Sequence, residues 1–369
     1  MPDVSSPASS SQACQAFLLG PLLEGVSRSF YLTLRVLPGG MRAPVGLAYL
    51  LARAADTIAD TSLIAPPQRL DLLLSLRSQV NGTPDETALA RIASEVAKQQ
   101  TQSNEKTLLE SLGPALAILA QLDEPDRAAV RQIVTTLTEG MEFDLRTFPD
   151  EHAGKVVALC NMAELDRYTY LVAGCVGEFW TVMSRAHVPR TFADEQDFDV
   201  AVQRGVRFGK ALQMTNVLRD CGKDLRIGRC YLPQTLLAEH GLTPEALLQT
   251  DASQRARVLL SDLLCVTLDH FRAAMDYTLA LPRFSVRLRL ACLWPVLIGL
   301  QTSLALAQND NWLNPAKASR IARGNVYRIL FGSALQVPCN NRLHVWANRL
   351  IAQIEHANRE QMCTVRRAG

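Results

Sequence analysis

Two pairs of aspartates are the residues of this sequence most suited to chemistry, because each pair interrupts an otherwise apolar stretch. Asp56 and Asp60 lie four residues apart in "LARAADTIADT", and Asp220 and Asp224 lie four apart in "NVLRDCGKD". In an α-helix a four-residue step returns to nearly the same face, about 6 Å along the axis. Each pair is therefore expected to present two carboxylates side by side.

Polar residues one and two turns earlier extend each pair into a stripe: Tyr49 and Arg53 before the first pair, Gln213 and Asn216 before the second. A solvated helix face usually explains one such stripe, but two matching stripes favour a site. Oxygen ligands without His or Cys suit Mg²⁺, which commonly joins protein carboxylates to phosphate oxygens. The predicted magnesium ligands are Asp56, Asp60, Asn216, Asp220 and Asp224.

Basic residues cluster in the sequence around both stripes. Arginine binds phosphate through its planar, bidentate guanidinium group. Each arginine alone is more often part of a surface ion pair, but together they fit the departure of a diphosphate, whose developing charge must be stabilised. The clustered basic residues are Arg28, Arg53, Arg219, Arg226 and Arg229, and the hydroxyl residues Ser27 and Ser29 lie on either side of Arg28.

The elements that would position these residues are helices. Apolar residues recur at spacings of three and four over long segments, and the alternation typical of strands is almost absent. Proline-containing breaks such as Pro66-Pro67 and 81–84 separate the segments. We predict an all-α protein with a single domain over 14–356, a disordered tail over 1–13 and a polar tail over 357–369. The predicted helices include 41–60, 69–80, 88–100, 107–122, 126–145, 164–184, 200–220 and 255–281.

Composition excludes several other classes of protein. The formal net charge is +2 and aromatic residues make up 6% of the 369 residues, which argues against nucleic-acid binding. Nine cysteines at wide spacings, with no C-x-x-C, indicate reduced thiols rather than disulfides or a zinc site. The start lacks a signal-peptide pattern. The apolar segment 290–307 is interrupted by polar residues, so a buried helix is favoured over a membrane span.

Three ordered blocks of the sequence resemble the squalene/phytoene synthase family. They are "VSRSFYLTLRVLPGGMRAPVGLAYLLARAADTIAD", "YTYLVAGCVGEFW" and "GKALQMTNVLRDCGKDLRIGRCYLP", and the resemblance covers roughly 20–335. It implies an isoprenoid (class I terpene) synthase-type helical bundle around a central cavity. It also implies that two prenyl diphosphates are joined head to head with Mg²⁺.

Within this family the sequence resembles squalene synthases most. "NPAKASRIARGNVYRIL" is similar to a basic segment that those enzymes use towards the phosphate of NADPH, with Arg320 and Arg323 at basic positions and Ala322 at a position that is commonly basic. Ala59 and Lys223 stand where eukaryotic squalene synthases often carry an acid. Leu171 replaces a tyrosine before Val-Ala-Gly, and Tyr168 and Tyr170 lie nearby. The eukaryotic C-terminal membrane anchor has no counterpart, which fits a bacterial form.

The resemblance implies conversion of two molecules of farnesyl diphosphate to presqualene diphosphate and then, with hydride from NADPH, to squalene. Asp56, Asp60, Asp220 and Asp224 would be catalytic, and Tyr168, Tyr170 or the departed diphosphate would take the proton. The implied cofactor contacts are Arg28, Arg53, Arg219, Arg320 and Arg323. The implied substrate contacts are Ser27, Arg28, Ser29, Phe30, Tyr49, Arg53, Gln213, Asn216, Arg219, Arg229 and Tyr231.

Several alternatives remain at this stage. A phytoene synthase, a dehydrosqualene synthase and an enzyme that stops at presqualene diphosphate share the first half-reaction. Two further readings are a family member that has lost catalysis and acts as an assembly protein, and a plain helical scaffold. The four retained aspartates argue against both. The expected location is the cytoplasm, with peripheral contact to the inner membrane for product release. The sequence does not indicate an oligomeric state.

Overall fold

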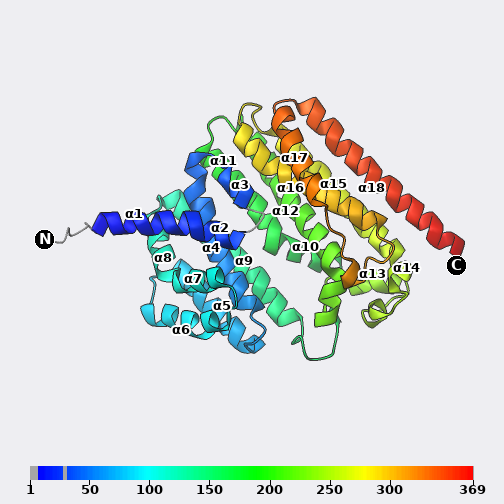
Figure 1. Ribbon diagram of the computed structural model, residues 1–369, viewed down its shortest axis with the longest axis horizontal. Helices are drawn as coiled ribbons and strands as arrows, with labels where there is room; N and C mark the ends of the chain where they lie inside the picture. The colour runs from blue at the N-terminus through cyan, green and yellow to red at the C-terminus, as the bar shows by residue number, and fades with distance from the viewer. Residues whose placement is uncertain (1–6, 28–30, 369) are drawn as a thin grey trace. The chain divides into compact units, whose positions relative to one another are not determined.

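A computed structural model of the chain describes residues 7–27 and 31–368, and these are almost entirely helical (Figure 1). They divide into two compact units, Met1–Leu145 and Arg146–Gly369, where the sequence indicated one domain. The prediction of an all-α protein is confirmed. The one pair of strands among the described residues is a two-residue parallel ladder that pairs β1 (Val157–Ala158) with β2 (Arg229–Cys230).

The first unit is arranged around α4 (Gly39–Asp60), which packs against α2, α3, α5, α7 and α8. Its buried residues, among them Leu47, Leu51, Ala54 and Ile58, follow the three- and four-residue spacing that the sequence displays. The other helices of this unit are α1 (Pro7–Phe17), α2 (Leu23–Ser27), α3 (Tyr31–Arg35), α5 (Pro66–Asn81), α6 (Glu86–Val96), α7 (Ser103–Glu110), α8 (Leu112–Gln121) and α9 (Glu124–Thr147).

The second unit is arranged around α12 (Glu195–Asp224), which packs against α10, α11, α15 and α16. Gly205 of α12 and Gly177 of α11 lie against each other, and a Cβ on Gly177 would lie only 1.7 Å from the carbonyl oxygen of Gly205. The helices of this unit are α10 (Met162–Thr169), α11 (Cys175–His187), α12, α13 (Gln234–Glu239), α14 (Ala252–Arg255), α15 (Arg257–Ala280), α16 (Val286–Gln308), α17 (Arg323–Gln336) and α18 (Asn340–Ala368).

The apolar segment predicted to be a buried helix is α16. Among the described residues it is the one helix long and apolar enough to cross a membrane, and 67% of its most apolar window is buried. It packs against α12, α15, α17 and α18 (Figure 1).

Both ends of the described chain contain more helix than the sequence suggested. Residues 7–13 belong to α1, although a disordered tail was predicted over 1–13. Pro7 stands at the first helical position, where its missing N–H costs nothing, and alanines later in α1 favour helix. The segment predicted as a polar tail over 357–369 continues α18 as far as Ala368.

Candidate functional site

The first aspartate pair lies at the end of α4, in the first unit. Asp60 is the last residue of the helix and is exposed, whereas Asp56, one turn earlier, is partly buried. The C-terminus of a helix carries partial negative charge, so two carboxylates are poorly placed there unless a cation joins them. This unfavourable placement indicates a functional rather than a stabilising role for the pair.

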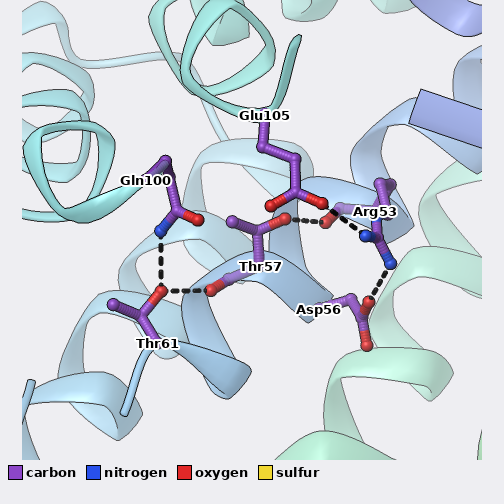
Figure 2. A network of polar contacts seen from close by, with 6 residues as sticks. All are labelled: Arg53, Asp56, Thr57, Thr61, Gln100 and Glu105. Carbon is purple, nitrogen blue, oxygen red and sulfur yellow. Dashed lines mark hydrogen bonds and ion pairs between the residues drawn. The ribbon is translucent and has the colours of Figure 1, made fainter. Parts of the chain in front are cut away.

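An arginine partly compensates the charge of this pair (Figure 2). Arg53 donates through Nη1 to Asp56 at 2.6 Å and through Nη2 to Glu105 of α7 at 2.5 Å. Burial, and then repulsion from Asp60, raise the pKa of Asp56 to about 6, although Arg53 acts in the opposite direction. Without a metal, Asp56 therefore takes up a proton more readily than an ordinary aspartate.

Hydroxyl groups on the side of α4 that faces α7 and the residues just before it hold this end of the helix in place. Thr57 donates to the carbonyl of Arg53 at 2.9 Å, and Thr61 donates to the carbonyl of Thr57 at 2.6 Å. Gln100 donates to the hydroxyl of Thr61 at 2.9 Å, as Figure 2 shows. These contacts fix the last turn of α4, and with it the direction in which the Asp56 side chain points from the helix.

Other predicted substrate residues of the first unit are placed as follows. Tyr49 lies on α4, two turns before Asp56, and is partly buried. Ser27 is buried at the end of α2, where its hydroxyl donates to the carbonyl of Leu23 at 2.5 Å. Arg28, Ser29 and Phe30, which were predicted to contact the substrate, lie outside the described residues.

The second pair repeats this arrangement at the end of α12. Asp224 is the last residue of the helix, and Asp220 lies one turn earlier. Arg219 donates to both carboxylate oxygens of Asp220, at 3.0 and 2.5 Å. Burial, followed by the charge of Asp220, raises the pKa of Asp224 to about 7, and the nearby charge of Arg229 partly opposes this. Half of this acid is therefore protonated near neutral pH in the absence of a cation.

The polar stripe predicted before this pair is present. Gln213 and Asn216 lie two turns and one turn before Asp220, respectively, and are partly buried, and the Asn216 amide donates to Gln213 at 3.4 Å. The structure therefore brings the two amides together with the two carboxylates on α12.

Arg229 and Tyr231 follow a tight turn after α12. Gly228 has a φ of +84°, which favours glycine, and a Cβ there would lie 2.5 Å from the carbonyl oxygen of Lys155. Beyond it, β2 pairs with β1, so Arg229 is held opposite Val157 and Tyr231 follows directly. Arg226, also in the predicted basic cluster, instead donates to the carbonyls of Gly222 and Leu313.

The two candidate tyrosines occupy different environments. The Tyr168 ring stacks on Tyr231 with a centroid distance of 4.7 Å, and its hydroxyl accepts from Gln213 at 3.5 Å. The Tyr170 hydroxyl donates to Glu178 at 2.9 Å from the first residue of a π-helical turn, Tyr170–Gly174. Tyr168 is thus joined to the α12 stripe through Gln213, whereas Tyr170 is joined to an acid of α11.

The predicted NADPH contacts lie at the start of α17. Arg323 is the first residue of this helix, and Arg320 lies in the segment before it, so the two do not share a helical turn. Both are exposed. Asn309, at the end of α16, donates to the carbonyl of Lys317 and to the hydroxyl of Ser319, which fixes the path of this segment. Two exposed guanidinium groups carry the positive charge that binding a phosphate requires.

The carboxylate oxygens of the two aspartate pairs are ligands of the type that Mg²⁺ prefers. Each unit supplies two carboxylates one helical turn apart, and burial together with the neighbouring carboxylate raises the pKa of one acid in each pair. Within the described part of the chain, no three His, Cys, Asp or Glu side chains gather into a metal-binding group. Diphosphate oxygens and water would complete the coordination, as is usual for Mg²⁺.

Two acids that the sequence analysis did not single out contact predicted site residues. Glu105 accepts from Arg53, and Glu178 accepts from Tyr170. The partner of Glu105 is 52 residues away in the sequence, so no local pattern marks it. The Tyr170–Glu178 spacing of eight residues was visible, but it does not single out one acid.

Comparisons with known proteins place these features in a family. The family model described as "Squalene/phytoene synthase" matches residues 23–323. The bifunctional lycopene cyclase/phytoene synthase of Colletotrichum graminicola is 30% identical over 259 residues, which are 68% of this chain and 40% of that protein. The chain spans less than half the length of the curated relatives it matches.

Solved structures match most of the chain. A complex of TcSQS with the ligand BPH1237 aligns with a TM-score of 0.72 at 21% identity, over 97% of this chain and 99% of that one. A dehydrosqualene synthase in complex with a ligand aligns with a TM-score of 0.57 at 19% identity, over 89% of this chain and 97% of that one. These likenesses confirm the predicted isoprenoid synthase fold.

Proposed function

Since the chain belongs to the squalene/phytoene synthase family, we propose that it is a Mg²⁺-dependent prenyltransferase that joins two prenyl diphosphates head to head. The observation that carries this proposal is the repeated half-site. Both α4 and α12 end on an aspartate pair, and in each pair the first carboxylate is bound by an arginine. Each unit would thus supply carboxylates for a cation and a guanidinium group for a phosphate.

The two pairs would act on the diphosphates of the substrates. When bound, Mg²⁺ would neutralise the charge that develops on a departing diphosphate. Arg53 and Arg219 now pair with Asp56 and Asp220, and they would turn part of their donor capacity to diphosphate oxygens. Arg229, which lies near Asp224, would add a third guanidinium group.

The aromatic pair Tyr168 and Tyr231 would line the path of the carbocation. Ring faces attract cations, and a stacked, largely buried pair keeps water away from them. The Tyr168 hydroxyl, which Gln213 joins to the α12 stripe, is the protein group best placed to move a proton there. Tyr170 is the alternative, with Glu178 as its acceptor, and the departed diphosphate is a third candidate.

For the product, we favour squalene made from farnesyl diphosphate with NADPH as the hydride donor. The support is the basic segment at the start of α17, where Arg320 and Arg323 are both exposed. Phytoene, made from C20 substrates without a hydride, is the second candidate. It is favoured by the curated relatives, since both the Colletotrichum graminicola protein and a chloroplastic protein of Narcissus pseudonarcissus are described as phytoene synthases.

One product analysis separates these candidates. Purified protein is incubated with Mg²⁺ and either farnesyl or geranylgeranyl diphosphate, with and without NADPH, and the products are read by mass spectrometry. We expect squalene from farnesyl diphosphate only when NADPH is present, and presqualene diphosphate or dehydrosqualene without it. A C40 product that ignores NADPH would establish phytoene synthesis instead. No condensation under any condition would refute the prenyltransferase assignment itself.

The same assay tests the basic segment. In the Arg320→Ala/Arg323→Ala double variant, squalene should fall relative to presqualene diphosphate at subsaturating NADPH, while the first half-reaction continues. A charge-assisted hydrogen bond contributes about 1.5–3 kcal/mol, so the affinity for NADPH should drop by roughly one to a few powers of ten. An unchanged product ratio would exclude this segment as the cofactor site.

A further inference from the structure

Helix α17 carries an exposed apolar stripe. Tyr327, Phe331 and Leu335 follow one another at four-residue spacing, so they share one side of the helix, and 60%, 74% and 85% of their surfaces are exposed. Most large apolar residues of the second unit are buried, whereas this stripe lies open over two turns. An exposed apolar patch of this kind on a folded protein usually marks a contact surface.

The opposite side of α17 holds the helix firmly on the second unit. Ile329 and Ser333 are buried there, and the Trp294 indole of α16 donates to the Ser333 hydroxyl at 2.9 Å. Gly332 packs against Trp346 of α18, so that a Cβ on Gly332 would lie 3.1 Å from the indole ring. The exposed stripe is therefore presented by a fixed helix.

In the sequence around the stripe, basic residues are present and acidic ones are missing. Between residues 311 and 354 the sequence contains six lysines and arginines and no aspartate or glutamate. Arg328 lies beside Tyr327 and is exposed. Since the whole chain has a formal net charge of only +2, this concentration of positive charge is local.

A second exposed apolar group lies near the far end of the same helix. Phe284, 93% exposed, and the exposed Val286 lie at the start of α16, between Arg283 and Arg287. Arg289 of α16 donates to Asn340, which begins α18 only four residues after α17 ends, so the start of α16 lies near the end of α17. Exposed apolar and basic residues are therefore found at neighbouring ends of the two helices.

We propose that this surface, formed by α17 and the start of α16, docks on a lipid bilayer that contains anionic headgroups. Aromatic and aliphatic side chains would enter the boundary between headgroups and acyl chains, while the arginines would contact lipid phosphates; this division is characteristic of helices that lie on membranes. The absence of acidic residues between 311 and 354 favours an anionic lipid surface over a second copy of this chain, because two such surfaces would repel each other. The inference does not depend on which product the site makes.

Sedimentation of the full-length protein with vesicles tests this proposal. Vesicles of phosphatidylcholine alone are compared with vesicles that contain 30% phosphatidylglycerol, at low and high NaCl, without substrate. We expect the protein to sediment with the anionic vesicles and to be released by salt. Phe331→Ser/Leu335→Ser should weaken partitioning by at least about tenfold, because two apolar side chains no longer enter the bilayer. Arg328→Glu should weaken it at low salt.

Matched variants in the first unit serve as controls. Leu63→Ser removes another apolar side chain that is 75% exposed, and Lys98→Glu makes a like charge reversal at another exposed position. Both should bind vesicles as the wild type does, and thermal melts should show that all variants are folded. Wild-type protein that does not sediment with anionic vesicles, or a double variant that binds as well as the controls, would overturn the proposal. A dimer in sedimentation velocity that Phe331→Ser/Leu335→Ser dissociates, without lipid binding, would instead assign the surface to a second copy.

Discussion

Asp224→Asn should stabilise the metal-free protein at alkaline pH. Asp224 ends α12, and burial together with the charge of Asp220 raises its pKa from the ordinary 3.8 to about 7. Below pH 4 the acid is protonated in both the folded and the unfolded chain, so its charge costs nothing. Between pH 4 and 7 it ionises in the unfolded chain first, and the folded state loses stability as the pH rises. Above pH 7 the loss is complete.

The size of this loss follows from the pKa difference. Each pKa unit corresponds to about 1.4 kcal/mol, so the ionised carboxylate costs the fold at most about 4 kcal/mol. Because the side chain is partly exposed, solvent screens its charge, and we expect about 2 kcal/mol. Asparagine has the same shape without the charge, so the variant should escape this loss.

Thermal melts in EDTA at several pH values provide the assay. At pH 8.5 the Asp224→Asn protein should melt ~2–5 °C above wild type, and the gap should shrink to less than half of this by pH 5. Mg²⁺ with inorganic diphosphate should raise the Tm of wild type but not of the variant, because a ligand stabilises only the state that binds it. Asp276→Asn, at an exposed position on α15, is the control and should show neither effect.

Two results would refute this reasoning. One is a Tm gap between Asp224→Asn and wild type that does not change between pH 5 and 8.5, since the gap would then not come from ionisation. The other is a variant that melts below wild type at pH 8.5 in EDTA, which would show that the carboxylate stabilises the empty site.

Two further predictions concern the tyrosines and the helix contact in the second unit. Tyr168→Phe should abolish formation of presqualene diphosphate while inhibitory binding of a non-ionisable substrate analogue persists; the same defect in Tyr170→Phe alone would move the role to Tyr170. Gly177→Ala should lower the Tm markedly, because the new Cβ would lie 1.7 Å from the Gly205 carbonyl oxygen and must push α11 from α12. Gly113→Ala, whose Cβ would have its nearest neighbour at 3.9 Å, should leave the Tm unchanged or slightly raised, and a similar loss in both variants would contradict the packing argument.

Sequence alone predicted the parts of the site that depend on position along a helix. Asp56 and Asp60 share a face of α4, and Asp220 and Asp224 share a face of α12, because a four-residue spacing determines this once the segment is helical. The all-α fold was predictable for the same reason, since the apolar spacing is local information. The central cavity that the resemblance implies stays a prediction.

Contacts between distant segments were beyond the sequence. Glu105 reaches Arg53 only because α7 packs on α4, and nothing in the sequence around Glu105 distinguishes it from the other acids of the chain. The sequence did not show where α17 begins, so Arg320 could not be placed before its first residue, Arg323. The helix over 7–13 was missed because its serines are typical of loops, while its alanines and its leading proline also suit a helix.

The central claim is that both aspartate pairs bind the magnesium and diphosphate of the reaction, and release of diphosphate tests it most directly. The release rate from farnesyl or geranylgeranyl diphosphate is measured at saturating Mg²⁺ and in EDTA, for wild type, Asp56→Asn and Asp220→Asn, with Asp276→Asn as the control. We expect release by wild type and the control only with Mg²⁺, and a loss of at least about 100-fold in each site variant, since removing one metal ligand costs several kcal/mol of transition-state stabilisation. Near-normal release by either site variant, or release by wild type in EDTA, would contradict the claim.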